Sequence, residues 1–116
     1  MNPEIKALVE RLEVEINEIE REASAGIVRT RELLSLFPDN AVLIQFFAYF
    51  NSTLFFIQNA FRRIQTALEI LETEERDNNN VSAELIQETA EDLATLLGEL
   101  LEAKIRTNNY RRRLDN

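Results

Sequence analysis

The chain is almost free of residues that interrupt helices, and this restricts its fold more than any other feature. Its 116 residues include only two glycines and two prolines. Between these breaks, apolar residues recur at alternating steps of three and four, the spacing that places side chains on one helix face. We therefore predict an all-α protein of three long helices. The length suits one small domain.

The few interruptions set the expected helix boundaries. Asn2 followed by Pro3 is typical of a helix start, because asparagine caps free N–H groups and proline lacks one. Pro38 disfavours helical geometry in the residue before it. The asparagine-rich run 77–80 favours a turn, and Ser82 can cap the helix that follows. Within the single domain 1–116 we predict helices at about 3–37, 40–76 and 82–110 and a basic C-terminal tail at 104–116.

The first two predicted helices carry matching apolar seams. The seam of the first helix consists of Ile5, Val9, Leu12, Ile16, Ile19, Ala23, Gly26, Thr30, Leu33 and Phe37. The seam of the second helix consists of Leu43, Phe47, Phe50, Leu54, Ile57, Phe61, Ile64, Leu68 and Leu71. A chain reversal at Pro38 would place Ile27 near Phe50, so the small residues of segment 23–26 would face that ring. We expect Gly26 to be kept for this close packing. The third helix would follow antiparallel to the second, giving an up-down-up, coiled-coil-like bundle.

The start of the second helix is apolar around its whole circumference, and such a helix needs burial on all sides. The apolar pattern of the third helix ends at Ile105, which we place beside Ser52, so we expect no third helix over residues 41–51. Three aromatic rings left in water would forgo on the order of 10 kcal/mol. A second copy is the simplest cover. We predict a homodimer, as a six-helix bundle, or a higher homo-oligomer with an interface formed by Val42, Phe46, Phe47, Tyr49 and Phe50.

The chemistry open to the chain is narrow, because it has neither cysteine nor histidine. This excludes thiol chemistry, imidazole ligands and the Ser-His-Asp type of nucleophile. We expect no cofactor, no metal site and no catalysis, and we interpret the chain as a protein–protein interaction module: a scaffold, adaptor or regulatory subunit with a further, unidentified protein partner. The N-terminus lacks the basic start and apolar core of a secretory signal, so we expect a cytoplasmic protein.

One enzymatic alternative rests on carboxylates near the asparagine-rich turn. Glu69 and Glu72 precede the turn, and Glu88 with Glu91 or Asp92 follows it. This spacing resembles the ExxE-then-ExxD pattern of the all-α nucleoside triphosphate pyrophosphatases. The resemblance implies carboxylates on facing helices that hold magnesium near a triphosphate. The chain departs from the pattern because Glu91 stands at the aspartate position and no lysine lies nearby.

The basic end of the chain contrasts with its net charge of −8, which disfavours nucleic acid as a partner. The candidate contacts for an anionic partner are Lys104, Arg106, Arg111, Arg112 and Arg113. Four interpretations are open: a solubilising helix end whose cations suit the helix dipole, pairing with the acidic first helix of the same chain or a partner, an anionic lipid surface, or nucleic acid.

The second helix contains an uncharged run of 22 residues, 40–61, which also raises the question of a membrane span. We expect no integral membrane segment, because several polar residues interrupt the run and the apolar seam continues beyond it to Leu71. Gln45, Ser52 and Asn59 recur every seven residues within it. We predict that they face solvent; the alternative is a hydrogen-bonded layer inside an oligomer.

Overall fold

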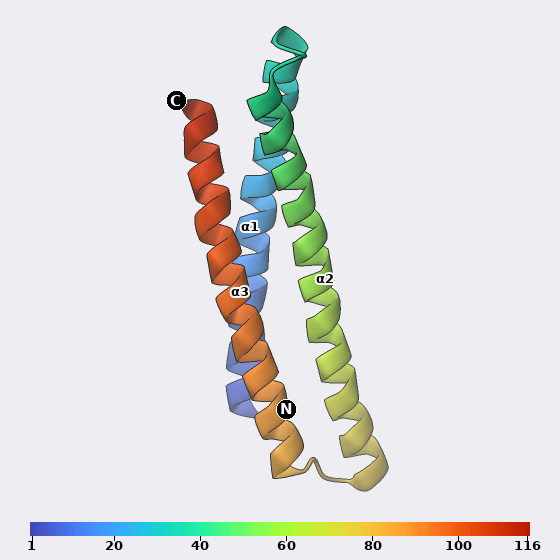
Figure 1. The fold of residues 1–116 in the computed structure, drawn as a ribbon. Coiled ribbons are helices and arrows are strands. Elements are labelled where there is room, and N and C mark those ends of the chain that lie inside the picture. The colour runs from blue at the N-terminus through green and yellow to red at the C-terminus, as the bar shows by residue number, and fades with distance from the viewer.

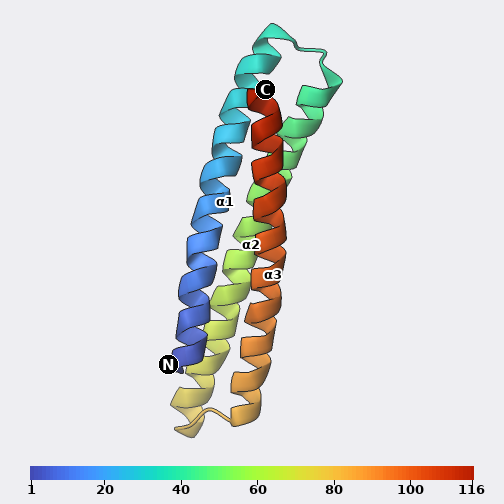
Figure 2. The same ribbon diagram turned by 90° about the vertical axis from the view of Figure 1, so that its left-hand side faces the viewer.

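The computed structural model describes residues 1–116 as three helices without strands, which confirms the all-α prediction. The helices are α1 (Pro3–Leu36), α2 (Ala41–Asn78) and α3 (Ala83–Asp115). The chain turns back between α1 and α2 and again between α2 and α3, so the helices lie side by side in a rod of 60 × 20 × 16 Å (Figure 1). The C-terminus lies below the α1–α2 turn, which projects beyond α3 (Figure 2).

Side-chain caps define where the helices begin, as the sequence predicts. The Asn2 side chain accepts hydrogen bonds from the backbone N–H groups of Glu4 and Ile5 at 2.9 and 3.2 Å, directly before Pro3. Asn40 accepts one from Leu43 N–H at 3.1 Å. Ser82 caps α3 in the same way. Each cap satisfies N–H groups that have no partner within the helix.

The larger of two core clusters fills the bundle from the N-terminus of α1 to its middle. It is aliphatic and draws on all three helices. Its fully buried members include Ile5, Leu12 and Leu100. The predicted seam of α1 is buried from Ile5 to Thr30, which confirms that part of the prediction. The members of this cluster are Ile5, Val9, Leu12, Ile16, Ile19, Ile57, Ala60, Ile64, Leu71, Leu93, Leu96 and Leu100.

The smaller cluster lies towards the α1–α2 turn and is built around one aromatic ring. Its members are Ala23, Ile27, Phe46, Phe50 and Leu114. The Phe50 ring lies against Gly26, where a Cβ atom would stand 2.6 to 2.7 Å from three ring carbons. Phe50 is fully buried. The expectation that small residues of α1 make room for this ring is confirmed.

The prediction that no third helix covers residues 41–51 was wrong, because α3 continues as a helix to Asp115 and packs there. The alternating spacing of three and four runs on through Thr107 to Tyr110 and Leu114. Leu114 belongs to the smaller cluster, and Tyr110 packs against it. The polar Thr107 interrupts the apolar pattern, which is why the pattern was read as ending at Ile105.

The core face of α2 is also rotated relative to the predicted seam. Phe61 was placed in that seam, yet its side chain is 45% exposed, whereas Ala60 beside it is buried. The difference arises because α2 faces two helices, so its buried residues lie between an α1-facing and an α3-facing edge. Gln45, Ser52 and Asn59 are exposed, as predicted for a solvent-facing stripe.

One helix, α2, is long and apolar enough by length and composition to cross a membrane. Its most apolar window of 18 residues has a mean hydropathy of 1.4. The same helix supplies Phe46, Phe50 and Ile57 to the core shared with α1 and α3.

Candidate functional site

The five residues predicted to form an oligomer interface have different environments. Phe46 and Phe50 are 7% and 0% exposed and belong to the core of a single chain. Phe47 and Tyr49 are half-buried. Only Val42, at 56%, is largely exposed. The premise that a lone chain leaves these rings in water is therefore corrected: α1 and the last turns of α3 cover most of them.

The covering contacts centre on Tyr110 of α3. Its ring meets that of Phe46 edge-on at a centroid distance of 4.9 Å and stacks on Tyr49 at 4.0 Å. Both are favourable aromatic geometries. The Thr107 hydroxyl donates to the Ala103 carbonyl at 2.7 Å and lies 3.4 Å from the Tyr49 hydroxyl. A buried threonine is thus satisfied inside its own helix, and the interface between α2 and α3 continues past it.

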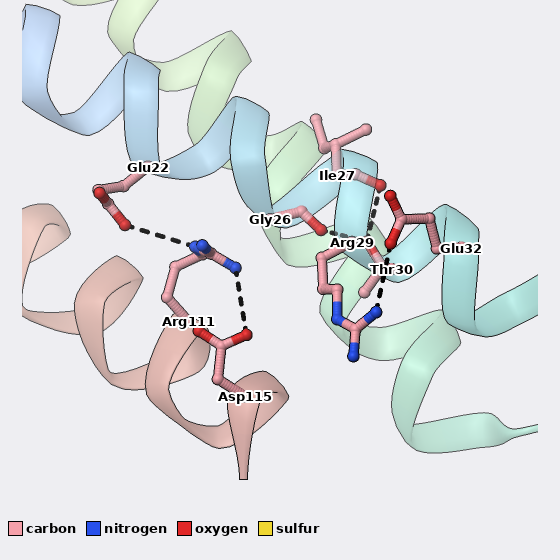
Figure 3. A network of polar contacts seen from close by, with 8 residues as sticks. All are labelled: Glu22, Gly26, Ile27, Arg29, Thr30, Glu32, Arg111 and Asp115. Carbon is pink, nitrogen blue, oxygen red and sulfur yellow. Dashed lines mark hydrogen bonds and ion pairs between the residues drawn. The ribbon is translucent and has the colours of Figure 1, made fainter.

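Two of the five predicted anion-binding residues instead pair with acidic residues of α1. Lys104 Nζ lies 3.0 Å from a carboxylate oxygen of Glu15 and 2.7 Å from one of Glu18. Arg111 Nε lies 3.4 Å from a Glu22 oxygen. Figure 3 shows Arg111 between Glu22 and Asp115. Lys104 and Arg111 therefore follow one of the four interpretations of the basic tail, which is pairing with the first helix of the same chain.

The Lys104 ion pairs shift two titrations. The hydrogen bond and the charge of Lys104 lower the pKa of Glu18, and desolvation opposes them only in part. The hydrogen bonds to Glu18 and then Glu15 raise the pKa of Lys104. Both groups are held in their charged forms. These residues link α1 to α3 and leave Lys104 little capacity for an external anion.

The remaining three basic residues, Arg106, Arg112 and Arg113, are exposed. The Arg113 guanidinium lies over the rings of Phe46 and Tyr110, at 5.7 and 5.8 Å from their centroids. Arg31 of α1 lies over the Phe47 ring in the same manner, at 5.7 Å. These cations therefore sit around the aromatic end of the bundle with their charges open to solvent.

Exposed apolar residues gather at the same end. We call the segment 36–42, where α1 ends and α2 begins, the hairpin tip. Its Leu36, Phe37 and Val42 are 70%, 56% and 56% exposed. α3 ends before reaching the α1–α2 turn (Figure 2). The predicted lack of a covering third helix thus exists at the turn.

A second apolar surface follows α2 on the side away from the core. We call it the outer face of α2 and define it as Ile44, Ala48, Asn51 and Phe55, whose spacing of four, three and four places them on one side of a helix. All four are exposed, Ile44 by 51% and Phe55 by 70%. The sequence prediction missed this surface because it assigned the aromatic surplus to Phe46 and Phe50. The period of three and four through Ile44 and Phe55 was a usable signal.

The carboxylates of the enzymatic alternative do not form a site in this structure. No group of three or more Asp and Glu side chains is close enough to hold a metal ion. Glu69, Glu72, Glu88 and Glu91 are all exposed. The largest hollow, of about 700 Å³, is an open groove between α1 and α3 with walls mainly of alanine and leucine. Its lining also includes Glu4, Arg11, Gln87 and Glu91.

The charges of the chain are divided unevenly along the rod. The half that contains the hairpin tip, residues 17–58 and 102–116, has eight Lys and Arg and seven Asp and Glu. The other half, which we call the acidic half, has five and fourteen. The net charges are therefore +1 and −9.

Neither a protein-family model nor a curated protein nor a solved structure matches the chain.

Proposed function

We propose that this protein is a non-catalytic helical interaction module that self-associates through the outer face of α2. In this proposal two up-down-up antiparallel bundles form a dimeric six-helix assembly. The observation that supports it is a surface that is uncharged along residues 40–61 and exposes Ile44 and Phe55. Exposed apolar patches of this kind mark interaction sites on soluble proteins.

Charge complementarity favours a second copy in the antiparallel orientation. The uncharged run is flanked by Asp39 on one side and by Arg62 on the other. When two α2 helices pack antiparallel about the centre of this run, Asp39 of each copy meets Arg62 of the other. The near-neutral halves of the two rods then lie beside each other and the acidic halves extend from opposite ends of the assembly, which separates the two clusters of carboxylates. A two-fold arrangement covers the outer face of α2 on both copies at once.

The buried aromatic residues have a supporting part in this proposal. Phe46 and Phe50 fix α2 against α1 and α3, so the outer face is presented on a helix held from behind. A rigid surface lowers the entropy lost on association. A scaffold, adaptor or regulatory role in the cytoplasm, with a further protein bound to the assembly, belongs to the same proposal.

Size-exclusion chromatography with light scattering tests the self-association. The chain has a mass of 13.5 kDa, and we expect the native protein at micromolar concentration to show about twice that mass. The double variant Ile44→Gln, Phe55→Gln should elute as a folded monomer. The matched control is Ile70→Gln, which replaces another exposed isoleucine of α2 outside the uncharged run. A native protein with the mass of one chain would refute the proposal.

A charge exchange tests the orientation of the two copies. Asp39→Arg and Arg62→Asp should each weaken the dimer, because each places like charges opposite one another. The two changes together should restore it, since the pair is then reversed and not lost. Restoration supports antiparallel packing about the centre of residues 40–61. Additive weakening in the double variant would contradict that geometry while leaving the mass measurement to judge self-association.

A further inference from the structure

We propose that the hairpin tip docks on an anionic lipid surface. The tip projects beyond α3 at one end of a rod 60 Å long and exposes Leu36, Phe37 and Val42. These side chains differ from those of the outer face of α2, because they lie at the end of the molecule and can enter a flat surface end-on. Apolar residues presented in this way can be buried in the boundary between headgroups and acyl chains.

Three arginines of α1 and α3, which we call the collar, lie one to two helical turns below the tip. Arg31 and Arg113 are held over the rings of Phe47 and Phe46, and Arg112 accompanies Arg113 at the end of α3. Arg31 stands six positions before Phe37, which corresponds to about 9 Å along a helix. Apolar residues of surface-bound helices lie about 5 to 10 Å deep in the interface. The collar therefore falls at the level of the lipid phosphates when the tip is inserted.

The net charge of −8 does not prevent this contact, because most of the negative charge is remote. The acidic half, with its net charge of −9, begins at the middle of the 60 Å rod. Charges in solution are screened over about 10 Å at moderate salt. The region around the tip, residues 28–45 and 109–116, contains five arginines and three carboxylates. The net charge of this region is therefore positive, opposite in sign to that of the acidic half.

The three carboxylates near the tip differ in how strongly they would repel an anionic surface. Glu32 pairs with Arg29 at 3.2 Å, and Asp115 lies 3.8 Å from Arg111. Arg111 itself is shared with Glu22, so it adds little to the collar. Asp39 lies in the tip itself and is the group that opposes insertion. The arrangement of apolar residues in the centre and cations around them fits a lipid surface, whereas a nucleic acid would need no exposed Leu36 or Phe37.

Co-sedimentation with vesicles tests this proposal. The full chain should bind vesicles that contain phosphatidylserine and phosphatidylcholine, should release them as salt is raised, and should not bind phosphatidylcholine alone. The double variant Leu36→Ser, Phe37→Ser should abolish sedimentation. Removing Arg112 or Arg113 should weaken binding about fivefold each. Asp39→Asn should strengthen it. Because all these side chains are exposed, circular dichroism should show unchanged helix content.

Two further variants separate docking by the tip from self-association. Ile70→Ser removes an exposed isoleucine remote from the tip and should leave vesicle binding unchanged. Phe55→Gln weakens the proposed dimer and should strengthen vesicle binding, because in the antiparallel dimer the acidic half of the partner extends past the tip and only the single chain can dock end-on. No sedimentation of the native chain with anionic vesicles would overturn the proposal. Salt-sensitive binding that ignores Leu36→Ser, Phe37→Ser would overturn it as well, because that result would mean electrostatic attraction without insertion.

Discussion

The two ends of the bundle are held together by different kinds of packing. The larger core cluster has twelve buried aliphatic residues from three helices, ten of them in the acidic half. The smaller cluster lies in the tip half and has five buried residues, centred on Phe50 and completed by Leu114. Aliphatic side chains share the first core among many similar contacts, whereas a single ring that fits against Gly26 determines much of the second. One core is therefore redundant and the other depends on a few residues.

The same division separates the surfaces. The acidic half carries most of the carboxylates, fourteen of the 21. The tip half is nearly neutral and exposes Phe37, Ile44 and Phe55. The surface available for partners thus lies over the core that is built from fewer residues. In this protein, aromatic residues of α2 serve the core on one side and an open surface on the other.

The largest effect on stability should come from removing the Phe50 ring at the centre of the smaller core cluster. Phe50→Ala should lower the free energy of unfolding by about 3–5 kcal/mol, because it leaves a cavity among fully buried groups. Phe55→Ala, five residues later on the same helix but 70% exposed, should change it by less than about 0.5 kcal/mol in the monomer. Urea denaturation at low protein concentration measures both. Equal losses would show that the two rings are not divided between core and surface.

The two glycines should respond in opposite directions to the same substitution. Gly26→Ala should lower the free energy of unfolding by about 1–3 kcal/mol, because the added Cβ collides with the Phe50 ring, which has no free space. Gly98→Ala should raise it by about 0.5–1 kcal/mol, since no atom lies within 4 Å of the new Cβ and alanine favours the helix. Thermal unfolding followed by circular dichroism compares them directly. A stabilising Gly26→Ala would mean that Phe50 is not held there.

The smallest effect should be the pH dependence of the ion pairs that join α1 and α3. The pKa of Glu18 is lowered, so its contribution is complete above its usual value of 4.5 and is lost as pH falls through the folded value. The pKa of Lys104 is raised, so its contribution is complete below 10.5 and is lost as pH rises through the folded value.

Glu18→Gln should therefore flatten the acid side of the stability profile, and Lys104→Met should flatten both sides. Glu13→Gln, at another exposed position of α1, provides the matched control. Denaturation midpoints between pH 3 and pH 11 would measure the profile, a range chosen to bracket the usual carboxyl and lysine values of about 4 and 10. An unchanged acid limb in Glu18→Gln would show that the pair of Glu18 with Lys104 does not contribute to stability.

Much of the fold could be predicted from sequence, because its signals are local. Asn2, Asn40 and Ser82 cap the helices within three residues of themselves. The α1 seam repeats without interruption as far as Thr30. The contact between Gly26 and Phe50 followed from counting back from the turn at Pro38. Such features need only the periodicity of a helix and one short connection.

The environment of the predicted interface could not be predicted in the same way, because it depends on where α3 ends. Thr107 is polar in the sequence but buried in the structure, where its hydroxyl bonds to Ala103. Ending the apolar pattern of the third helix at Ile105 left Phe46 and Phe50 without cover in the prediction. The pairing of Lys104 with Glu15 and Glu18 depends on the longitudinal position of α3 beside α1, which no local pattern specifies. Both corrections concern α3.

Disulfide trapping across the outer face of α2 tests the proposed assembly most directly. The chain has no cysteine, so a single introduced thiol can pair only with its copy on another chain. Asn51 lies at the centre of the uncharged run, and antiparallel packing brings its two copies within the roughly 7 Å between Cα atoms that a disulfide allows. We predict rapid, near-complete cross-linking of Asn51→Cys under mild oxidation, and little of Thr95→Cys on the exposed side of α3. Equal, slow cross-linking of both variants would contradict self-association through the outer face of α2.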